Sequence, residues 1–150
     1  MRVLDRLAGP NPPRLVVVDP CPTPVAAVAT VHLAIKSGTN VALLNAFLHE
    51  ILENGLYDEG YVEAHTIGFD ELRRTVAECT PEWAAEVRGV EADEIKEAAR
   101  ILGESERLLS TVLQGVYQSH QATAAACQIN KHLLRGMIGR PRCGVLQFNG

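Results

Sequence analysis

Short apolar runs rich in β-branched residues alternate along this sequence with longer segments of helical periodicity. The first two runs cover residues 15–18 and 31–35, and residues 108–113 form a third. Each run is too short for a helix and is bounded by turn-forming residues, which is typical of strands. The longest helical segment, 39–54, repeats apolar residues at a spacing of three and four. Strands separated by helices predict βαβ units and a parallel sheet.

Shorter helical segments occupy most of the remaining chain. We expect them at residues 58–65, 69–77, 81–87, 93–102 and 121–135. Residues 1–14 and the Gly-rich residues 136–150 are predicted to be irregular. The predicted fold is therefore α/β, with a Rossmann-like parallel sheet flanked by helices over residues 15–150. We expect the sheet to be incomplete because only three strands are recognisable, and the run 15–18 to be buried on both faces.

Charge and composition exclude several classes of function. The 150 residues carry a net charge of −4 without a cluster of Lys or Arg, which argues against a nucleic-acid partner. No apolar run approaches the ~20 residues that span a bilayer, and the N-terminus lacks the apolar core of a secretory signal. We therefore expect no membrane partner and a cytoplasmic location. The four cysteines never form a C-x-x-C pair, so no metal site is predicted.

Polar residues and glycines follow each of the three predicted strands, where ligands of open parallel sheets bind. Asp19 ends the first strand, and its carboxylate can accept hydrogen bonds from a guanine or ribose edge, although Asp-Pro is also common in turns. Residues 37–40 begin the long helix, where backbone N–H groups favour a phosphate, although Thr39 or Asn40 can simply cap the helix. Residues 114–121 combine Gly with amides, Tyr and His, and a binding role and a connecting role are equally open.

Familiar catalytic motifs are absent from the sequence. His49-Glu50 begins like a zinc-protease motif, but Glu53 occupies the position of the second histidine. The glycine fingerprint of dinucleotide-binding enzymes is also missing, which argues against a nicotinamide-dependent dehydrogenase. Cys127 and His132 are predicted to pack inside the fold. No catalytic and no metal-ligating residue is therefore assigned.

Several segments, taken in order and spacing, resemble the molybdopterin oxidoreductase family, which includes formate dehydrogenases and assimilatory nitrate reductases. The resemblance begins near residue 15 and covers nearly all of the rest of the chain. This part of the chain resembles an internal α/β domain of that family. The segments that carry it are residues 17–20, 32–40, 42–45, 55–58, 61–62, 68–72, 80–82, 89–90, 95, 98–100, 115–118 and 133–141.

The resemblance implies that this domain binds a nucleotide end of a bis(molybdopterin guanine dinucleotide) cofactor. The first loop would contact guanine or ribose, the second the same guanosine diphosphate, and the third the pterin or the diphosphate. Cys21 stands where the family usually has Arg, which removes a bidentate cationic donor. The residues that the resemblance assigns to cofactor binding are Asp19, Pro20, Cys21, Gly38, Asn40, Gly115, Val116 and Gln118.

The resemblance also implies that catalysis depends on parts of a parent oxidoreductase outside this segment. The molybdenum ligand, any iron–sulfur cluster and the C-terminal cofactor-binding domain would lie there, and these remaining domains would be the partners of this chain. We therefore expect a fragment or domain that is not catalytic as an isolated chain. The alternative from another class is a cofactor-free binding or interaction module, or a decayed fragment without activity.

Overall fold

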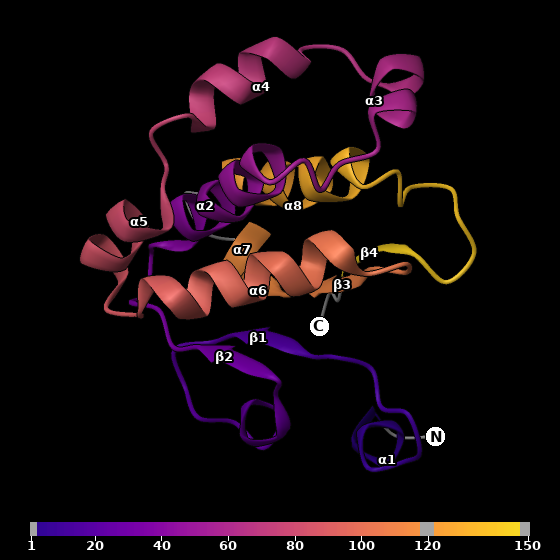
Figure 1. Cartoon of the computed structure of the whole chain (residues 1–150). Helices are drawn as coiled ribbons and strands as arrows, with labels where there is room; N and C mark the ends of the chain where they lie inside the picture. Colours follow the sequence, from indigo (N-terminus) through magenta and orange to yellow (C-terminus); the bar gives the residue numbers. More distant parts are fainter. Residues whose placement is uncertain (1–2, 118–121, 148–150) are drawn as a thin grey trace.

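The computed structural model describes residues 3–117 and 122–147, which form helices packed beside short strands (Figure 1). The strands are β1 (Val16–Val18), β2 (Val31–Leu33), β3 (Leu109–Val112) and β4 (Gly144–Gln147). The helices are α1 (Val3–Leu7), the 3-10 helix η1 (Ala26–Val28), α2 (Asn40–Glu53), α3 (Glu59–His65), α4 (Phe69–Val76), α5 (Pro81–Arg88), α6 (Ala92–Glu104), α7 (Gln114–Tyr117) and α8 (Ala122–Leu134).

The strands form two parallel pairs. Val16 of β1 lies opposite Val31 of β2, and Leu109 of β3 lies opposite Gly144 of β4. Helix α8 lies in the connection from β3 to β4, so this half of the fold is a βαβ unit. The predicted α/β class with parallel strands is confirmed. In the described part of the chain, however, the strands form two two-stranded sheets and not the single sheet that was expected.

Three local expectations were wrong. Strand β4 lies within residues 136–150, where an irregular segment was predicted, because its pairing with β3 is tertiary and leaves little trace in four residues. Helix α1 lies within residues 1–14, which were also predicted to be irregular. Strand β1 is not buried on both faces, since Val18 is 41% exposed. In this sheet β1 has β2 as its single neighbour, so less of its surface is covered than in a central parallel strand.

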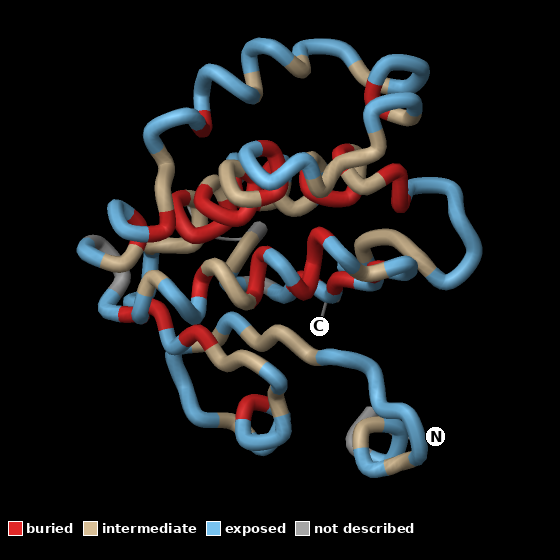
Figure 2. The backbone as a smooth tube through the Cα atoms, in the orientation of Figure 1, coloured by how far each residue is buried: buried red, intermediate tan, exposed pale blue. Residues whose placement is uncertain are grey.

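Helix α2 is the centre of the core. It packs against α6 and α8, and it also contacts α4 and α5. Leu43, Phe47, Leu48 and Ile51 of α2 are almost completely buried, which accounts for the buried segments along this helix in Figure 2. Helix α6 in turn contacts β2 and so lies between α2 and the β1–β2 pair (Figure 1). The aliphatic spacing of the sequence thus places the long helix correctly.

Side-chain caps define the starts of the shorter helices. Asp58 accepts a hydrogen bond from the backbone N of Tyr61 at 3.0 Å and caps α3. Thr80 accepts one from Trp83 N at 3.2 Å and caps α5, which ends at Gly89 in the left-handed conformation. In the described part of the chain, no helix is both long enough and apolar enough to cross a membrane.

Candidate functional site

The first candidate loop leaves β1 and is tied to the neighbouring strand β2. The backbone N of Asp19 donates to Leu33 O at 3.3 Å, and His32 Nε2 lies 2.9 Å from the carbonyl oxygen of Asp19. Because β1 and β2 are parallel, their carboxyl ends lie at the same edge. The loop after Asp19 and the loop that leads to α2 therefore start side by side.

The two oxygens of the Asp19 carboxylate differ in their contacts. Its Oδ1 accepts a hydrogen bond from Cys21 N at 2.8 Å, so the Asp-Pro turn forms as turn chemistry predicts. Within residues 3–117 and 122–147, Oδ2 receives no hydrogen bond. Pro20 and Cys21 are exposed. The turn therefore holds one carboxylate oxygen in place and leaves the second available as an acceptor.

The second loop reaches the start of α2 through Gly38, whose φ of +83° lies in the left-handed region. Thr39 occupies the N-cap position but makes no side-chain hydrogen bond to the helix, because its hydroxyl donates to the carbonyl of Lys36 instead. The first turn of α2 also contains no acidic residue. Simple capping by Thr39 is thus not how this helix begins, and its first turn remains suited to an anion.

A hydrogen bond joins the second loop to the third. Asn40 Nδ2 donates to the carbonyl of Gly115 at 3.2 Å across 75 residues of sequence. Gly115 lies in α7, just after β3, and a Cβ added there would meet no atom within 4 Å. Neighbouring packing therefore does not explain the glycine. Val116 is half-buried and donates its backbone N–H to Leu113 O at 3.0 Å, whereas Gln118 lies outside the described residues.

Among the described residues, two strongly shifted pKa values belong to a buried cluster under β3 and not to the three loops. Ser110 is buried on β3, and its Oγ lies 3.2 Å from Lys131 Nζ and 2.9 Å from His132 Nε2. Burial lowers the pKa of Lys131 to about 7 and, together with the charge of Lys131, lowers the pKa of His132 to about 4. Sequence reasoning missed Lys131 and Ser110 in this cluster.

A usable signal for Lys131 existed in the sequence. Ala124, Cys127 and Lys131 follow one another at a spacing of three and four, which places the lysine on the inward face of α8. His132 was expected to be packed, and it is fully buried; its Nδ1 has no hydrogen-bond partner among the described residues. The described residues contain no group of three or more His, Cys, Asp or Glu side chains arranged to hold a metal ion.

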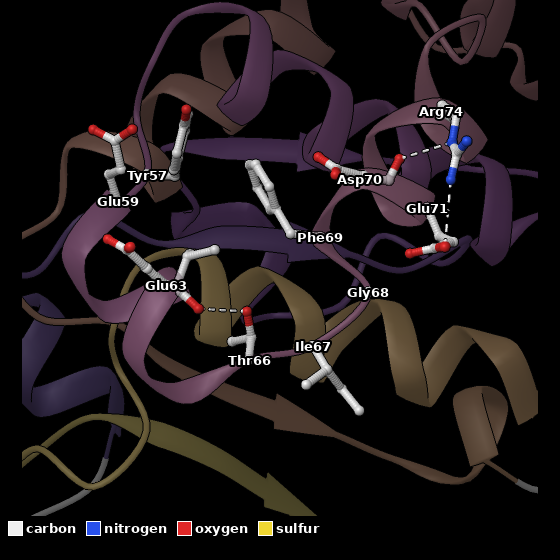
Figure 3. Close-up of a pocket in the computed structure, with 11 residues that line it drawn as sticks. Tyr57, Glu59, Glu63, Thr66, Ile67, Gly68, Phe69, Asp70, Glu71 and Arg74 are labelled. Atoms are coloured by element: carbon white, nitrogen blue, oxygen red, sulfur yellow. Dashed lines mark hydrogen bonds and ion pairs between the residues drawn. The ribbon is translucent and has the colours of Figure 1, made fainter.

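Two shallow hollows of the surface lie away from the three loops. One hollow of about 470 Å³ lies between α3 and α4, where Arg74 bonds both the Glu71 carboxylate and the Asp70 carbonyl, each at 3.3 Å (Figure 3). A second, of about 460 Å³, lies between α2 and α6. Neither is lined by a candidate residue. The candidate residues therefore belong to an open edge and not to either hollow.

Comparison with known proteins identifies the relatives of this fold. No family model matches the chain. It is 36% identical over 141 residues to formate dehydrogenase H of Escherichia coli (strain K12), and 34% identical over 138 residues to a nitrate reductase of Synechocystis sp.. These alignments cover 93% and 91% of the chain. The chain is a homologue of one part of the molybdopterin oxidoreductases.

The structural comparison agrees with the sequence comparison. Acetylene hydratase from Pelobacter acetylenicus superposes with a TM-score of 0.78 and 29% sequence identity over 86% of this chain. The chain spans about one fifth of the length of these relatives, with 20%, 19% and 18% of each covered. It therefore corresponds to a domain or fragment of a molybdopterin oxidoreductase, as the sequence predicted.

Proposed function

We propose that this chain is the lobe of a molybdopterin-dependent oxidoreductase that binds a guanine nucleotide end of the molybdopterin guanine dinucleotide cofactor. The observation that carries the proposal is the Asn40–Gly115 hydrogen bond, which joins the start of α2 to α7, the short helix that follows β3. Ligands of open parallel sheets bind at such strand-end edges. Homology to the molybdopterin oxidoreductases supplies the class of cofactor.

The residues at this edge fit the chemistry of a guanine nucleotide. The open Oδ2 of Asp19 is an acceptor suited to the N–H groups of guanine, which adenine lacks at the equivalent edge. The start of α2, with no acid in its first turn, suits a diphosphate. The exposed Gly115 lets a ligand approach the backbone closely. Pro20, Cys21, Gly38, Val116 and Gln118 would complete the binding surface.

This lobe would bind and orient the cofactor and would leave the reaction to the rest of the parent protein. When bound, the cofactor supplies a redox-active molybdenum. We place the molybdenum ligand, any iron–sulfur cluster and the substrate pocket in the remaining domains, which would be the partners of this chain. The activity proposed for the parent is that of a cytoplasmic formate dehydrogenase or nitrate reductase.

Titration of the purified chain with GDP tests this proposal. We expect a dissociation constant on the order of millimolar, because a lobe alone offers only part of the binding surface. Replacing Asp19 by Ala should weaken GDP about 10- to 100-fold, since hydrogen bonds to a charged group contribute roughly 1.5–3 kcal/mol. ADP should bind more weakly than GDP and should not distinguish Asp19→Ala from the wild type.

A control variant uses an exposed aspartate outside the candidate site. Asp70 lies in the first turn of α4, in the hollow of Figure 3 and not at the strand-end edge, so Asp70→Ala should leave GDP binding unchanged. Calorimetry measures the affinity, and amide shifts in an NMR titration should cluster at residues 19–21 and 38–40. Equal effects of both substitutions, or shifts elsewhere, would contradict the assignment.

The alternative function is a cofactor-free interaction module. It is favoured by the exposed leucines on one face of the β3–β4 sheet, and by Cys21 in place of a cationic donor. Absence of binding heat and of amide shifts at millimolar GDP would support this alternative.

A further inference from the structure

Two cysteines from separate elements lie against the same stretch of helix α2. Cys127 Sγ on α8 donates to Asn45 Oδ1 on α2 at 3.2 Å. Burial raises the pKa of the Cys79 thiol, and a hydrogen bond from the Asn45 side chain partly offsets that rise. Cys79 Sγ itself donates to the carbonyl oxygen of Thr75 at 3.8 Å. Cys79 lies in the connection between α4 and α5, far in sequence from Cys127 on α8.

Helix α2 fixes the position of Cys79. His49 lies one turn beyond Asn45, and its Nδ1 is 2.9 Å from the carbonyl oxygen of Val76. The same carbonyl accepts the backbone N–H of Cys79 at 3.0 Å. The segment that carries Cys79 is therefore attached to α2 close to Asn45. Because Cys79 is outside any helix, its side chain can shift without unwinding one.

We propose that Cys79 and Cys127 form a reversible oxidation site that a hydroperoxide converts into an intramolecular disulfide. Cys79 is half-buried and reacts first, whereas Cys127 is buried and resolves the intermediate. The Cys79 sulfur attacks the peroxide; an S–O bond forms, the O–O bond breaks, and the departing oxygen leaves as water or an alcohol, giving a sulfenic acid. The Cys127 sulfur then displaces the hydroxyl group of that sulfenic acid as a second water. Two electrons and two protons pass from the thiols to the peroxide.

The environment of the pair makes this site slow to react at neutral pH. Burial raises the pKa of both thiols, and the charge of a Cys79 thiolate further raises the pKa of Cys127. The thiolate is the reactive form, so the rate of disulfide formation should increase with pH. A disulfide reductant such as dithiothreitol should restore both thiols.

Peptide mapping of the intact chain tests the proposal directly. Trypsin places each cysteine in a different peptide, with Cys79 in residues 75–88 and Cys127 in residues 108–131. After hydrogen peroxide treatment and blocking of free thiols, we expect one dominant cross-link between these two peptides, with the loss of two hydrogen atoms. Sulfinic or sulfonic acid at Cys79 without that cross-link, or a random mixture of cysteine pairs, would overturn the proposal.

Variants of the other cysteines supply the controls. A Cys21→Ser, Cys143→Ser double variant should give the same cross-link, whereas Cys127→Ser should abolish it. Peroxide treatment in guanidinium should remove the preference for the pair, because the fold no longer brings the two thiols together. The disulfide closes a long loop, so the oxidised double variant should melt roughly 10 °C higher than its reduced form. An unchanged or lower melting temperature would contradict a link that fits the native fold.

Discussion

At the scale of single residues, the lysine of α8 is unusual because its ammonium group is buried and its pKa is strongly lowered. Lys131 is 3% exposed and is held by Ser110 and Gln128, with Nζ 2.6 Å from Gln128 Oε1. No ion pair to Lys131 occurs among the described residues. Burying an ammonium group without an acid is unfavourable, which is why its pKa falls to about 7.

Substitution of Lys131 should change how stability depends on pH. Between pH 7 and about 10.5 the unfolded lysine is protonated and the folded one is neutral, so the free energy of unfolding should rise with pH by up to about 1.4 kcal/mol per unit. Lys131→Met removes this rise and should not destabilise the chain at pH 7, because a buried cation is exchanged for an apolar side chain.

Urea unfolding at pH 7 and pH 9 measures that effect. The matched control is Lys96→Met. Nearly half of the Lys96 side chain is exposed to solvent, and its ammonium group pairs with Glu82 at 2.6 Å. The control variant should retain the rise in stability between the two pH values. A rise of equal size in Lys131→Met would show that another group causes it.

At the scale of elements, a glycine after α8 lets the connection to β4 approach α3. Gly136 has a φ of +59°, and a Cβ there would lie 2.9 Å from Asp58 Oδ2 and 3.2 Å from Tyr61 Cβ. Asp58 caps α3 and also pairs with Arg140 at 3.2 Å. One side chain added at position 136 therefore disturbs the helix cap and the ion pair together.

Gly136→Ala should destabilise the fold by about 2–4 kcal/mol, from the left-handed conformation and the displaced cap together. Gly139→Ala separates the two contributions, because Gly139 also has a positive φ, of +81°, but open space around its Cβ. It should cost only about 1–2 kcal/mol. Chemical unfolding of both variants checks the difference, and equal losses would mean that the contact with Asp58 contributes nothing.

The sequence predicts elements best where their patterns are local. The strand predicted at residues 15–18 and the helix predicted at residues 39–54 correspond to β1 and α2, within one or two residues. Strand β4 was missed because Gly144–Gln147 holds a single β-branched residue and depends on its pairing with β3. The Asn40–Gly115 contact could not be predicted from the sequence either, since nothing in either segment indicates its distant partner.

At the scale of the whole molecule, apolar side chains gather on one face of the β3–β4 sheet. The register places Leu146 beside Thr111, on the same face as Leu109 and Leu113. The exposed fractions are 54% for Leu109, 58% for Leu113 and 47% for Leu146. Parallel sheets are normally covered on both faces, so this surface is suited to contact with another protein surface.

Leu146→Lys should reduce self-association of the isolated chain. The change places a charge among the three leucines, so light scattering at high protein concentration should fall and solubility should rise. Ile67→Lys is the control, because Ile67 is fully exposed but lies between α3 and α4, away from the sheet. If the two substitutions act equally, general surface charge and not the leucine face governs association.

The two separate strand pairs have one more consequence. In the described part of the chain each sheet has two strands, so all four are edge strands with backbone N–H and C=O groups on one open side. Such edges are templates on which a foreign strand can polymerise, and natural proteins shield them. Within a larger protein, neighbouring strands, helices or loops would have to cover these edges to prevent such growth.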